Sequence, residues 1–329
     1  MKITEEDIRP EKIFNEYLAL TELDTITYFE KAENVDIDCP ACGGNEGKDW
    51  VKKSLFLYKK CPSCHTIYVS PRPVVESFNA YYTDSPSTKF WATTFYKVTE
   101  NARREKLWKP KAKLVKEKII ALGTENPINY IVDIGGGYGV FDEEIKIIMD
   151  VDVIVIEPSV HLAAICRQKG LQVIEKFMED IVFGELPVGR KCYVSFELFE
   201  HLHNPEKFLI TVFENMEVDD LFIFTTLSGM GIDIQLLGSQ SKALSPPHHL
   251  NFFNPKSITL LLEKIGFKVF EANTPGKLDV DILNKNKSAI KDIYWKNVFD
   301  YFSDNDLDIL QDSISNLGLS SHMMLVCSK

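Results

Sequence analysis

The segment from Ile131 to Gly139 constrains the fold more than any other part of this 329-residue chain. It opens with an apolar run, Ile-Val-Asp-Ile, of the kind that forms a strand buried on both faces. Glycines at 135, 137 and 139 follow, and they let the backbone approach a ligand closely where a helix begins. Position 140 is a valine, so the spacing differs from the Gly-x-Gly-x-x-Gly of dinucleotide-binding proteins. The segment predicts a strand, a ligand-binding loop and a helix.

Further apolar runs alternate with amphipathic stretches along the rest of the chain. The expected strands are 131–134, 153–156, 171–174, 192–196, 221–225, 267–270 and 322–327. Ser159, Asn204-Pro205 and Asn254-Pro255 are helix-start signals, and Gly170 and Gly266 are stop signals. Strands alternating with helices predict an α/β fold with a doubly wound, mainly parallel, seven-stranded sheet.

Four of the seven cysteines form two close pairs, Cys39-Pro-Ala-Cys42 and Cys61-Pro-Ser-Cys64. Two such knuckles can place four thiolates at the corners of a tetrahedron, which is the geometry of structural zinc sites. With four ligands the metal has no open position, so a structural role is expected. His65 would be a ligand only if it displaced a cysteine. Cys166, Cys192 and Cys327 lie in apolar segments and are expected to be buried thiols.

These signals divide the chain into four parts. We expect a lead-in at 1–36, a zinc-ribbon module at 37–73, a helical connector at 74–122 and the sheet domain at 123–329. Residues 54–58 look like a strand inside the zinc module, and 277–318 look like a helical insertion before the last strand.

The net charge of −11 limits the partners that the chain can bind. Nucleic-acid binders need a basic face, and the lysines at 109, 111, 113, 116 and 118 are expected to form a solvated helix face instead. A small-molecule substrate is therefore favoured over nucleic acid. The N-terminus has no secretory signal and no stretch is apolar enough to span a bilayer, so we expect a cytoplasmic protein without a membrane partner.

Glu157 ends the second expected strand, where a carboxylate can accept both hydroxyls of a ribose. With this acid, the glycine loop and the strand rhythm, the stretch from Ile131 to Phe270 resembles the class I S-adenosylmethionine-dependent methyltransferases. The resemblance implies S-adenosylmethionine as cofactor, with adenine contacts from the segment 177–180. The implied cofactor-binding residues are Asp133, Gly135, Gly136, Gly137, Gly139, Glu157, Pro158, Met178, Glu179 and Phe196. An oxidoreductase or a cofactor-free relative is the alternative.

Glu200 and His201 follow the fourth expected strand, at the edge where an open α/β sheet offers its crevice. The pair resembles a motif of one methyltransferase subgroup, in which it faces the cofactor and the substrate. His201 is a candidate general base, because a neutral imidazole suits proton transfer near pH 7. Equally, His201 could only brace the helix cap. His203 is expected to be structural.

Two adjacent histidines, His248 and His249, lie in the segment Ser245–Asn254. This segment and the tail at 274–280 resemble methyltransferases of sugar and surface-polysaccharide biosynthesis, including sugar C-methyltransferases with an N-terminal zinc module. The resemblance implies that His249 is the base. His248 stands where the C-methyltransferases have a glutamate, so C- and O-methylation both remain open. Asn251 is a lesser candidate, and a loop-anchoring role for the two histidines is the alternative.

The sequence thus predicts methyl transfer to a small polar metabolite, with a sugar or nucleotide sugar as the leading substrate. One alternative is an RNA or protein methyltransferase that uses the zinc module for docking. Another is a scaffold protein that keeps the cofactor pocket without turnover.

Overall fold

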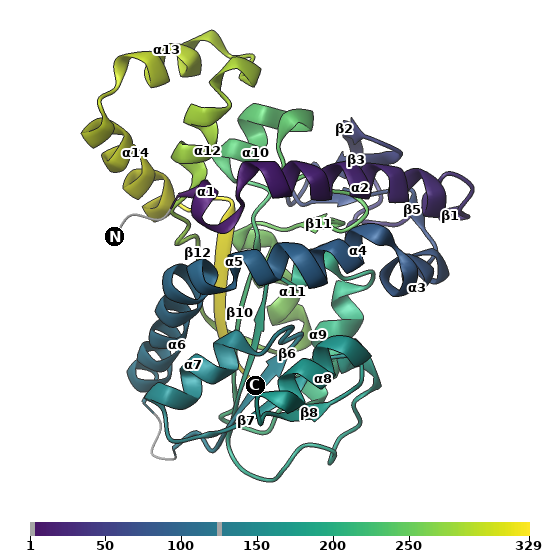
Figure 1. Cartoon of the computed structure of the whole chain (residues 1–329), viewed down its shortest axis with the longest axis vertical. Coiled ribbons are helices and arrows are strands. Elements are labelled where there is room, and N and C mark those ends of the chain that lie inside the picture. The colour runs from purple at the N-terminus through teal and green to yellow at the C-terminus, as the bar shows by residue number, and fades with distance from the viewer. Residues whose placement is uncertain (1–3, 124–126) are drawn as a thin grey trace. The chain divides into compact units, whose positions relative to one another are not determined.

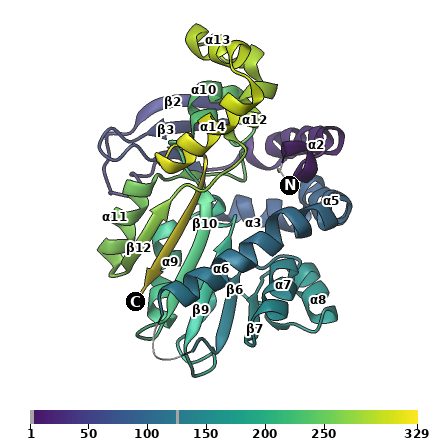
Figure 2. The ribbon, with the colours of Figure 1, turned by 90° about the vertical axis from the view of Figure 1, so that its left-hand side faces the viewer.

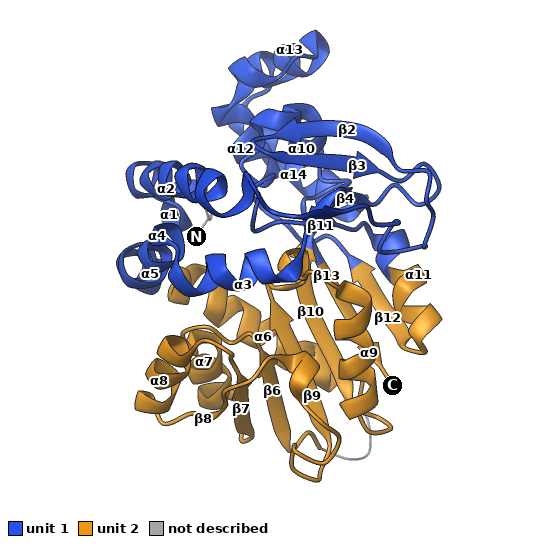
Figure 3. Ribbon diagram, turned by 90° about the vertical axis from the view of Figure 1, so that its right-hand side faces the viewer, with its two compact units in different colours: residues 1–102, 227–258, 273–323 blue, residues 103–226, 259–272, 324–329 orange. Residues whose placement is uncertain are grey.

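The computed structural model describes residues 4–123 and 127–329 of the chain (Figure 1). These residues form two compact units (Figure 3). One unit comprises residues 1–102, 227–258 and 273–323, and the other comprises 103–226, 259–272 and 324–329. We call them the first and the second unit.

The second unit carries nearly all of a seven-stranded sheet with the order β12-β13-β10-β9-β6-β7-β8. Its strands are β6 (Tyr130–Ile134), β7 (Asp152–Ile156), β8 (Gln172–Ile174), β9 (Lys191–Phe196), β10 (Leu221–Leu227), β12 (Lys268–Asn273) and β13 (His322–Ser328). The pairings of β10 with β9, β9 with β6, β6 with β7 and β7 with β8 are parallel. The prediction of a mainly parallel, seven-stranded sheet is confirmed, and each of its strands lies at an expected position.

Helices cover both faces of this sheet, as the alternation within β10 illustrates. Leu221 and Ile223 pack in one apolar core with residues of α6 (Lys109–Ala121), α7 (Val140–Ile148) and α8 (Val160–Gln168); Figure 2 shows α6 and α7 on this face. Phe222 and Phe224 point the other way, and Phe224 packs 5.3 Å from Phe199, which itself contacts α9 (Pro205–Asn215). Successive strand residues point to opposite faces, so a strand covered on both sides reads as one continuous apolar run.

The predicted helix-start signals are confirmed by local hydrogen bonds. The Ser159 hydroxyl accepts from the amide of Leu162 at the start of α8, and the Asn204 side chain accepts from the amide of Lys207 at the start of α9. Asn254 Oδ1 accepts from the amide of Ser257 at the start of α11 (Pro255–Ile265). These caps satisfy amides that have no partner within the helix.

The first unit contains a four-stranded sheet with the order β11-β4-β3-β2. Its strands are β2 (Lys48–Lys53), β3 (Phe56–Lys60), β4 (Ile67–Val69) and β11 (Asn251–Phe252), and β1 (Asn34–Val35) pairs separately with β5 (Arg72–Pro73). The expected strand over 54–58 is partly wrong, because Ser54 and Leu55 form the turn between β2 and β3. Ser54 has a φ of 50°, which belongs to a tight turn, and the polar residues of β2 concealed that strand from the sequence pattern.

Helices make up the rest of the first unit and the expected connector. They are α1 (Glu5–Ile8), α2 (Glu11–Phe29), α3 (Val75–Asp84), α4 (Pro86–Phe90), α5 (Tyr96–Arg103), α10 (Ile232–Leu237), α12 (Asp279–Lys285), α13 (Ile293–Tyr301) and α14 (Asp304–Asn316). Single π-helical turns, Trp91–Phe95 and Arg104–Trp108, interrupt the run from α4 to α6. The helices α12 to α14 form the insertion expected before the last strand. Among the described helices, none has the length and apolar character that a membrane span requires.

Candidate functional site

The glycine loop connects β6 to α7 in the second unit. Gly135, Gly137 and Gly139 have φ values of 76°, 59° and 66°, a region that residues with a side chain rarely adopt. At Gly139 a side chain would also collide with Leu171, because a Cβ there would lie 2.4 Å from Leu171 Cδ1. The space around the Cα of Gly137 is open. The loop is therefore anchored at Gly139 and leaves its backbone accessible at Gly137.

Glu157 ties this loop to the end of β7. Its carboxylate accepts hydrogen bonds from the amide of Gly137 at 3.1 Å and from the amide of Ser159 at 2.9 Å. The side chain is buried, and burial raises the pKa of the carboxyl. A carboxylate has about four lone-pair sites, so two amides leave capacity for ribose hydroxyls. Pro158 follows it directly, at the start of the turn into α8.

A second buried acid beneath the loop was missed by the sequence pattern. Asp133 and Asp142 are 2% and 0% exposed, and neither Asp142 oxygen has a hydrogen-bond donor among the described residues. Burial raises the pKa of Asp142 to about 7, and burial together with Asp142 raises the pKa of Asp133. Near neutral pH the two carboxyls therefore hold at least one proton between them. No simple sequence signal marks Asp142, which looks like an ordinary polar residue at the start of a helix.

The segment after β8 forms a short 3₁₀ turn, Met178–Asp180. Met178 is buried and Phe177 is exposed, while burial raises the pKa of Glu179. The segment thus offers an exposed ring and a half-buried acid as candidates for adenine contacts.

Glu197, directly after β9, meets Lys111 of α6, and the sequence analysis selected neither of them as a site residue. Glu197 has a φ of 55°, an uncommon conformation for a residue with a side chain. Its carboxylate accepts from the Thr225 hydroxyl at 2.9 Å and from Lys111 Nζ at 3.3 Å. The Lys111 ammonium also lies 4.6 Å from the ring centroid of Phe196.

The expected solvated face of α6 is only partly correct: Lys113 is exposed and Lys109 pairs with Glu105 one turn away, whereas three other lysines contact neighbouring elements. Lys111 pairs with Glu197, Lys118 pairs with Glu271 at 2.6 Å, and Lys116 donates to the carbonyl of Ile148. Their long side chains reach partners on neighbouring elements, and the spacing of the lysines along the helix could not show this.

Glu200 and His201 lie in a 3₁₀ turn, Phe199–His201, that follows β9. Glu200 is 1% exposed and its carboxyl accepts from the Thr226 hydroxyl at 2.9 Å. Burial, with a contribution from Glu197, raises the pKa of Glu200 to about 8. Near neutral pH this group is mostly a neutral acid, so it can donate a hydrogen bond but is a poor base.

His248 and His249 lie in the first unit and are held in different ways. The Nδ1–H of His249 donates to the carbonyl of Ala243 at 2.6 Å, so in the neutral ring Nε2 carries the lone pair. His248 Nε2 forms a 2.7 Å hydrogen bond with the Tyr81 hydroxyl, and burial lowers the pKa of His248 to about 3. His249 has the arrangement of a general base, and His248 is a neutral hydrogen-bonding group.

The segment that carries these histidines is part of the same sheet as the cysteine knuckles. Asn251 and Phe252 pair with Tyr68 and Ile67 of β4, and the Tyr58 hydroxyl of β3 donates to the carbonyl of His249 at 2.8 Å. Arg72 donates to the Asn251 side chain at 2.7 Å inside the core, which gives Asn251 a structural contact.

The four paired cysteines converge in this unit. Their sulfur atoms all lie within 4.8 Å of one another, with 3.4 Å between Cys39 and Cys64 and 3.6 Å between Cys42 and Cys61. These distances are too long for disulfides and suit four thiolates around one zinc ion. Cys166, Cys192 and Cys327 are buried free thiols, as expected.

The two knuckles have matching backbones. The amide of Gly43 donates to the carbonyl of Cys39, and the amide of His65 donates to the carbonyl of Cys61. Gly43 and His65 occupy the same left-handed position, with φ values of 72° and 61°. His65 therefore closes a turn with its backbone, and its side chain is not among the clustered metal-ligating groups.

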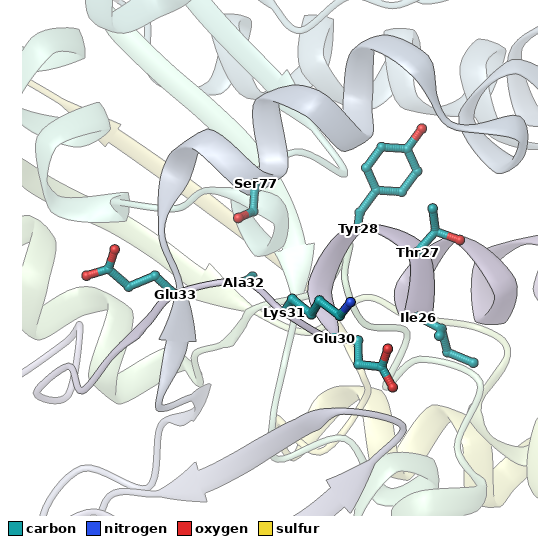
Figure 4. A pocket seen from close by; sticks show the side chains of 8 residues that line it. All are labelled: Ile26, Thr27, Tyr28, Glu30, Lys31, Ala32, Glu33 and Ser77. Atoms are coloured by element: carbon teal, nitrogen blue, oxygen red, sulfur yellow. The ribbon is translucent and has the colours of Figure 1, made fainter.

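The structure divides the predicted catalytic residues between the units, with Glu200 and His201 in the second and His248 and His249 in the first. A separate hollow of about 510 Å³ lies in the first unit, where the end of α2 meets α3 (Figure 4). It is lined by Ile26, Thr27, Tyr28, Glu30, Lys31, Ala32, Glu33 and Ser77. None of these is a predicted site residue.

Comparison with known proteins identifies the class. The model of a family described as a methyltransferase domain matches residues 101–272, which is more than half of the chain, so this chain belongs to that family. It is a class I S-adenosylmethionine-dependent methyltransferase, and therefore an enzyme.

Among solved structures, the chain is similar to the cyclopropane synthase MmaA2 from Mycobacterium tuberculosis, with 17% identity over 67% of this chain and 83% of that chain and a TM-score of 0.44. It is similar to an S-adenosylmethionine-dependent methyltransferase from Archaeoglobus fulgidus, with 15% identity, coverage of 66% and 94% and a TM-score of 0.45. It is also similar to the plantazolicin methyltransferase BamL, with 12% identity, coverage of 74% and 93% and a TM-score of 0.48. No curated protein matches the chain.

Proposed function

We propose that the enzyme methylates an oxygen or carbon of a sugar or nucleotide sugar and that His249 is the general base. The observation that carries this proposal is the 2.6 Å hydrogen bond from His249 Nδ1 to the Ala243 carbonyl. It orients the ring and places the hydrogen of the neutral imidazole on Nδ1, which is the tautomer whose Nε2 is the basic nitrogen. Its neighbour His248, held neutral by burial, suits hydrogen bonding to a substrate hydroxyl or carbonyl.

Each group of residues has a role in this proposal. The glycine loop and Glu157 bind the cofactor, and the segment at 177–180 contacts its adenine. When bound, S-adenosylmethionine supplies an activated methyl group. His249 would remove the proton of the acceptor oxygen or carbon. The electron pair on that atom would form the bond to the methyl group as the methyl–sulfur bond breaks and S-adenosylhomocysteine leaves, while Glu200, mostly protonated near neutral pH, donates a hydrogen bond. His201 is the second candidate base.

We further propose that Cys39, Cys42, Cys61 and Cys64 bind a structural zinc ion within a module at 37–73. The sulfur cluster, the paired backbone turns and the absence of a disulfide among the seven free cysteines support this assignment. The metal would stabilise the sheet that contains β11, which begins just after His249 and Leu250, and so would support the base.

The alternative of an RNA or protein methyltransferase has less support. The chain is strongly acidic, and three of the α6 lysines that could have formed a basic face, Lys111, Lys116 and Lys118, are engaged in ion pairs or hydrogen bonds. The edge of the zinc module beside β4 is also occupied by β11.

The test is methyl transfer to a panel of nucleotide sugars, measured as S-adenosylhomocysteine released and as a mass gain of one methyl group on the sugar. Replacing His249 with Gln should lower the rate by roughly 10²–10⁴-fold, the usual contribution of a general base, without changing cofactor affinity. The exposed His161 provides a control, and His161→Gln should react normally. A normal rate in His249→Gln would mean that the base is another residue, with His201 the next to replace. Turnover on RNA or protein alone would reject the sugar proposal, and no turnover on any acceptor would favour the scaffold alternative.

A further inference from the structure

Two cations of the first unit converge on one aromatic ring. Arg9 lies between α1 and α2, and Lys242 lies in the loop that continues to His248 and His249. The guanidinium carbon of Arg9 is 5.5 Å from the ring centroid of Phe14, and Lys242 Nζ is 5.4 Å from it. Both side chains are half-buried, so their charges are held near this ring.

Neither cation has a carboxylate within ion-pair distance in the part of the chain that the structure describes. Arg104, Lys111 and Lys191, by contrast, each have such a partner. A cation–π contact is a weak attraction that does not neutralise the charge. The positive potential at Phe14 is therefore available to an anion.

A third cation reinforces this potential. Lys53 Nζ donates to the carbonyl of Ser241 at 2.6 Å, directly beside Lys242 in the chain. The pKa of Lys53 is lowered to about 8 by burial, so its ammonium remains mostly charged at neutral pH. The loop at 241–249 thus has cations at its beginning and the two histidines at its end.

An aromatic row connects the cations to the histidines. Phe14 and Tyr17 of α2 are stacked with centroids 6.0 Å apart, and the Tyr17 ring is 6.0 Å from the ring of His248. Trp91 packs 4.8 Å from Tyr17 on the same row. The two cations therefore lie at the Phe14 end of this row, and His248 lies at its other end. Phe14 and Tyr17 are buried in one apolar cluster, so the row holds the cations and His248 at fixed positions.

We propose that Arg9 and Lys242 form a phosphate-binding subsite for a phosphorylated sugar, such as a sugar linked to a nucleoside diphosphate. Arg9 can bind phosphate oxygens in a bidentate manner, and Lys242 supplies a point charge. With the phosphates at Arg9 and Lys242, the sugar extends beside the loop that leads from Lys242 to His248 and His249. This inference rests on the proposed function, because it specifies which sugars the same site accepts.

A purely structural role for the two cations predicts different behaviour. If Arg9 and Lys242 only fasten α2 to the loop through Phe14, their replacement lowers stability and leaves anion binding unchanged. Binding and stability are therefore measured separately.

The experiment is calorimetric titration of the full chain with inorganic pyrophosphate, in the presence of S-adenosylmethionine. We expect the unmodified protein to bind pyrophosphate and both Arg9→Gln and Lys242→Gln to bind it at least tenfold more weakly. Arg9→Lys keeps the charge without the bidentate geometry, so its affinity should be intermediate. Lys52→Gln, which removes an exposed cation from β2, should bind as the unmodified protein does.

Thermal unfolding and S-adenosylmethionine binding show whether each variant is folded. If a Gln variant does not fold, Arg9→Lys and Lys242→Arg decide the matter. No binding of pyrophosphate by the unmodified protein, or equal binding by all folded variants, overturns the subsite. Failure of the proposed function is recognised separately, by the absence of methyl transfer to any free or phosphorylated sugar. Transfer to a free sugar without any effect of Arg9 or Lys242 overturns only the subsite.

Discussion

The side-chain amide of Asn254 donates a 2.8 Å hydrogen bond to the carbonyl oxygen of Cys64. The other end of the same side chain caps α11 by accepting from the amides of Lys256 and Ser257. One residue thus joins the second cysteine knuckle to the end of the histidine segment. Since the two positions are 190 residues apart in sequence, this contact connects the proposed zinc module to the segment that carries the proposed base.

Replacing Asn254 tests this connection. Asn254→Ala should lower the free energy of unfolding by about 1–2 kcal/mol, because it removes both the helix cap and the bond to Cys64. Asn254→Asp keeps the cap acceptor and loses the donor to Cys64, so it isolates the connection. We expect Asn254→Asp to reduce the methylation rate with little change in cofactor affinity. If urea unfolding and kinetics both match the unmodified protein, the contact has no role in holding the loop.

Loss of the metal should affect catalysis through the same sheet. Cys61→Ser should abolish stoichiometric zinc, measured by atomic emission, because three ligands cannot complete the structural site. It should also lower the melting temperature and the methylation rate more than it weakens cofactor binding. Cys327→Ala, which alters a buried thiol remote from the cluster in sequence, should keep the zinc. Full activity in a zinc-free Cys61→Ser protein would contradict the proposed support of His249 by the module.

The carboxylate of Glu157 has two tasks, since it holds the amide of Gly137 and is proposed to bind the ribose. Glu157→Ala should weaken S-adenosylmethionine binding by about 1–3 kcal/mol, the usual cost of losing charged hydrogen bonds. The control is Glu175→Ala, which removes a nearby acid that pairs with Arg167 on the surface. Unchanged affinity of Glu157→Ala by calorimetry would remove Glu157 from the cofactor site.

The buried pair of Asp133 and Asp142 predicts a pH dependence of stability. The pKa of Asp142 is about 7 in the folded protein and close to 4 in the unfolded chain. A carboxyl whose folded pKa is raised stabilises the fold fully below pH 4, and this contribution is lost as the pH rises through 7. The asparagine of Asp142→Asn does not ionise, so the variant avoids this loss. Its free energy of unfolding should exceed that of the unmodified protein by an amount that grows from pH 4 to pH 7, reaches a few kcal/mol and then stays constant.

Urea unfolding of both proteins at pH 4.5, 6 and 8 measures this difference. Asp152→Asn changes an exposed carboxylate at the start of β7 and should show no such trend. A constant difference between Asp142→Asn and the unmodified protein at all three pH values would contradict the raised pKa.

Local features of the sequence were sufficient to predict most of the fold. The strands of the parallel sheet are continuous apolar runs because both faces are buried, so each could be located without knowing its neighbours. The caps at Ser159, Asn204 and Asn254 depend on residues within one helical turn. Likewise, the spacing within Cys39–Cys42 and Cys61–Cys64 is sufficient to predict a metal-binding knuckle. The glycine loop could be predicted because its backbone conformations require glycine at those positions.

Only the tertiary structure decided which residues these features contact. The pairing of β11 with β4, the bond from Tyr81 to His248, the convergence of Arg9 and Lys242 on Phe14 and the burial of Asp142 all join residues with no fixed spacing in sequence. The sequence pattern predicted that the lysines of α6 form a solvated face, because a helix period shows which way a side chain points and not how far it extends. Hydrogen bonds, cation–π contacts and raised pKa values depend on distances of a few ångströms between remote segments, and only the folded chain sets those distances.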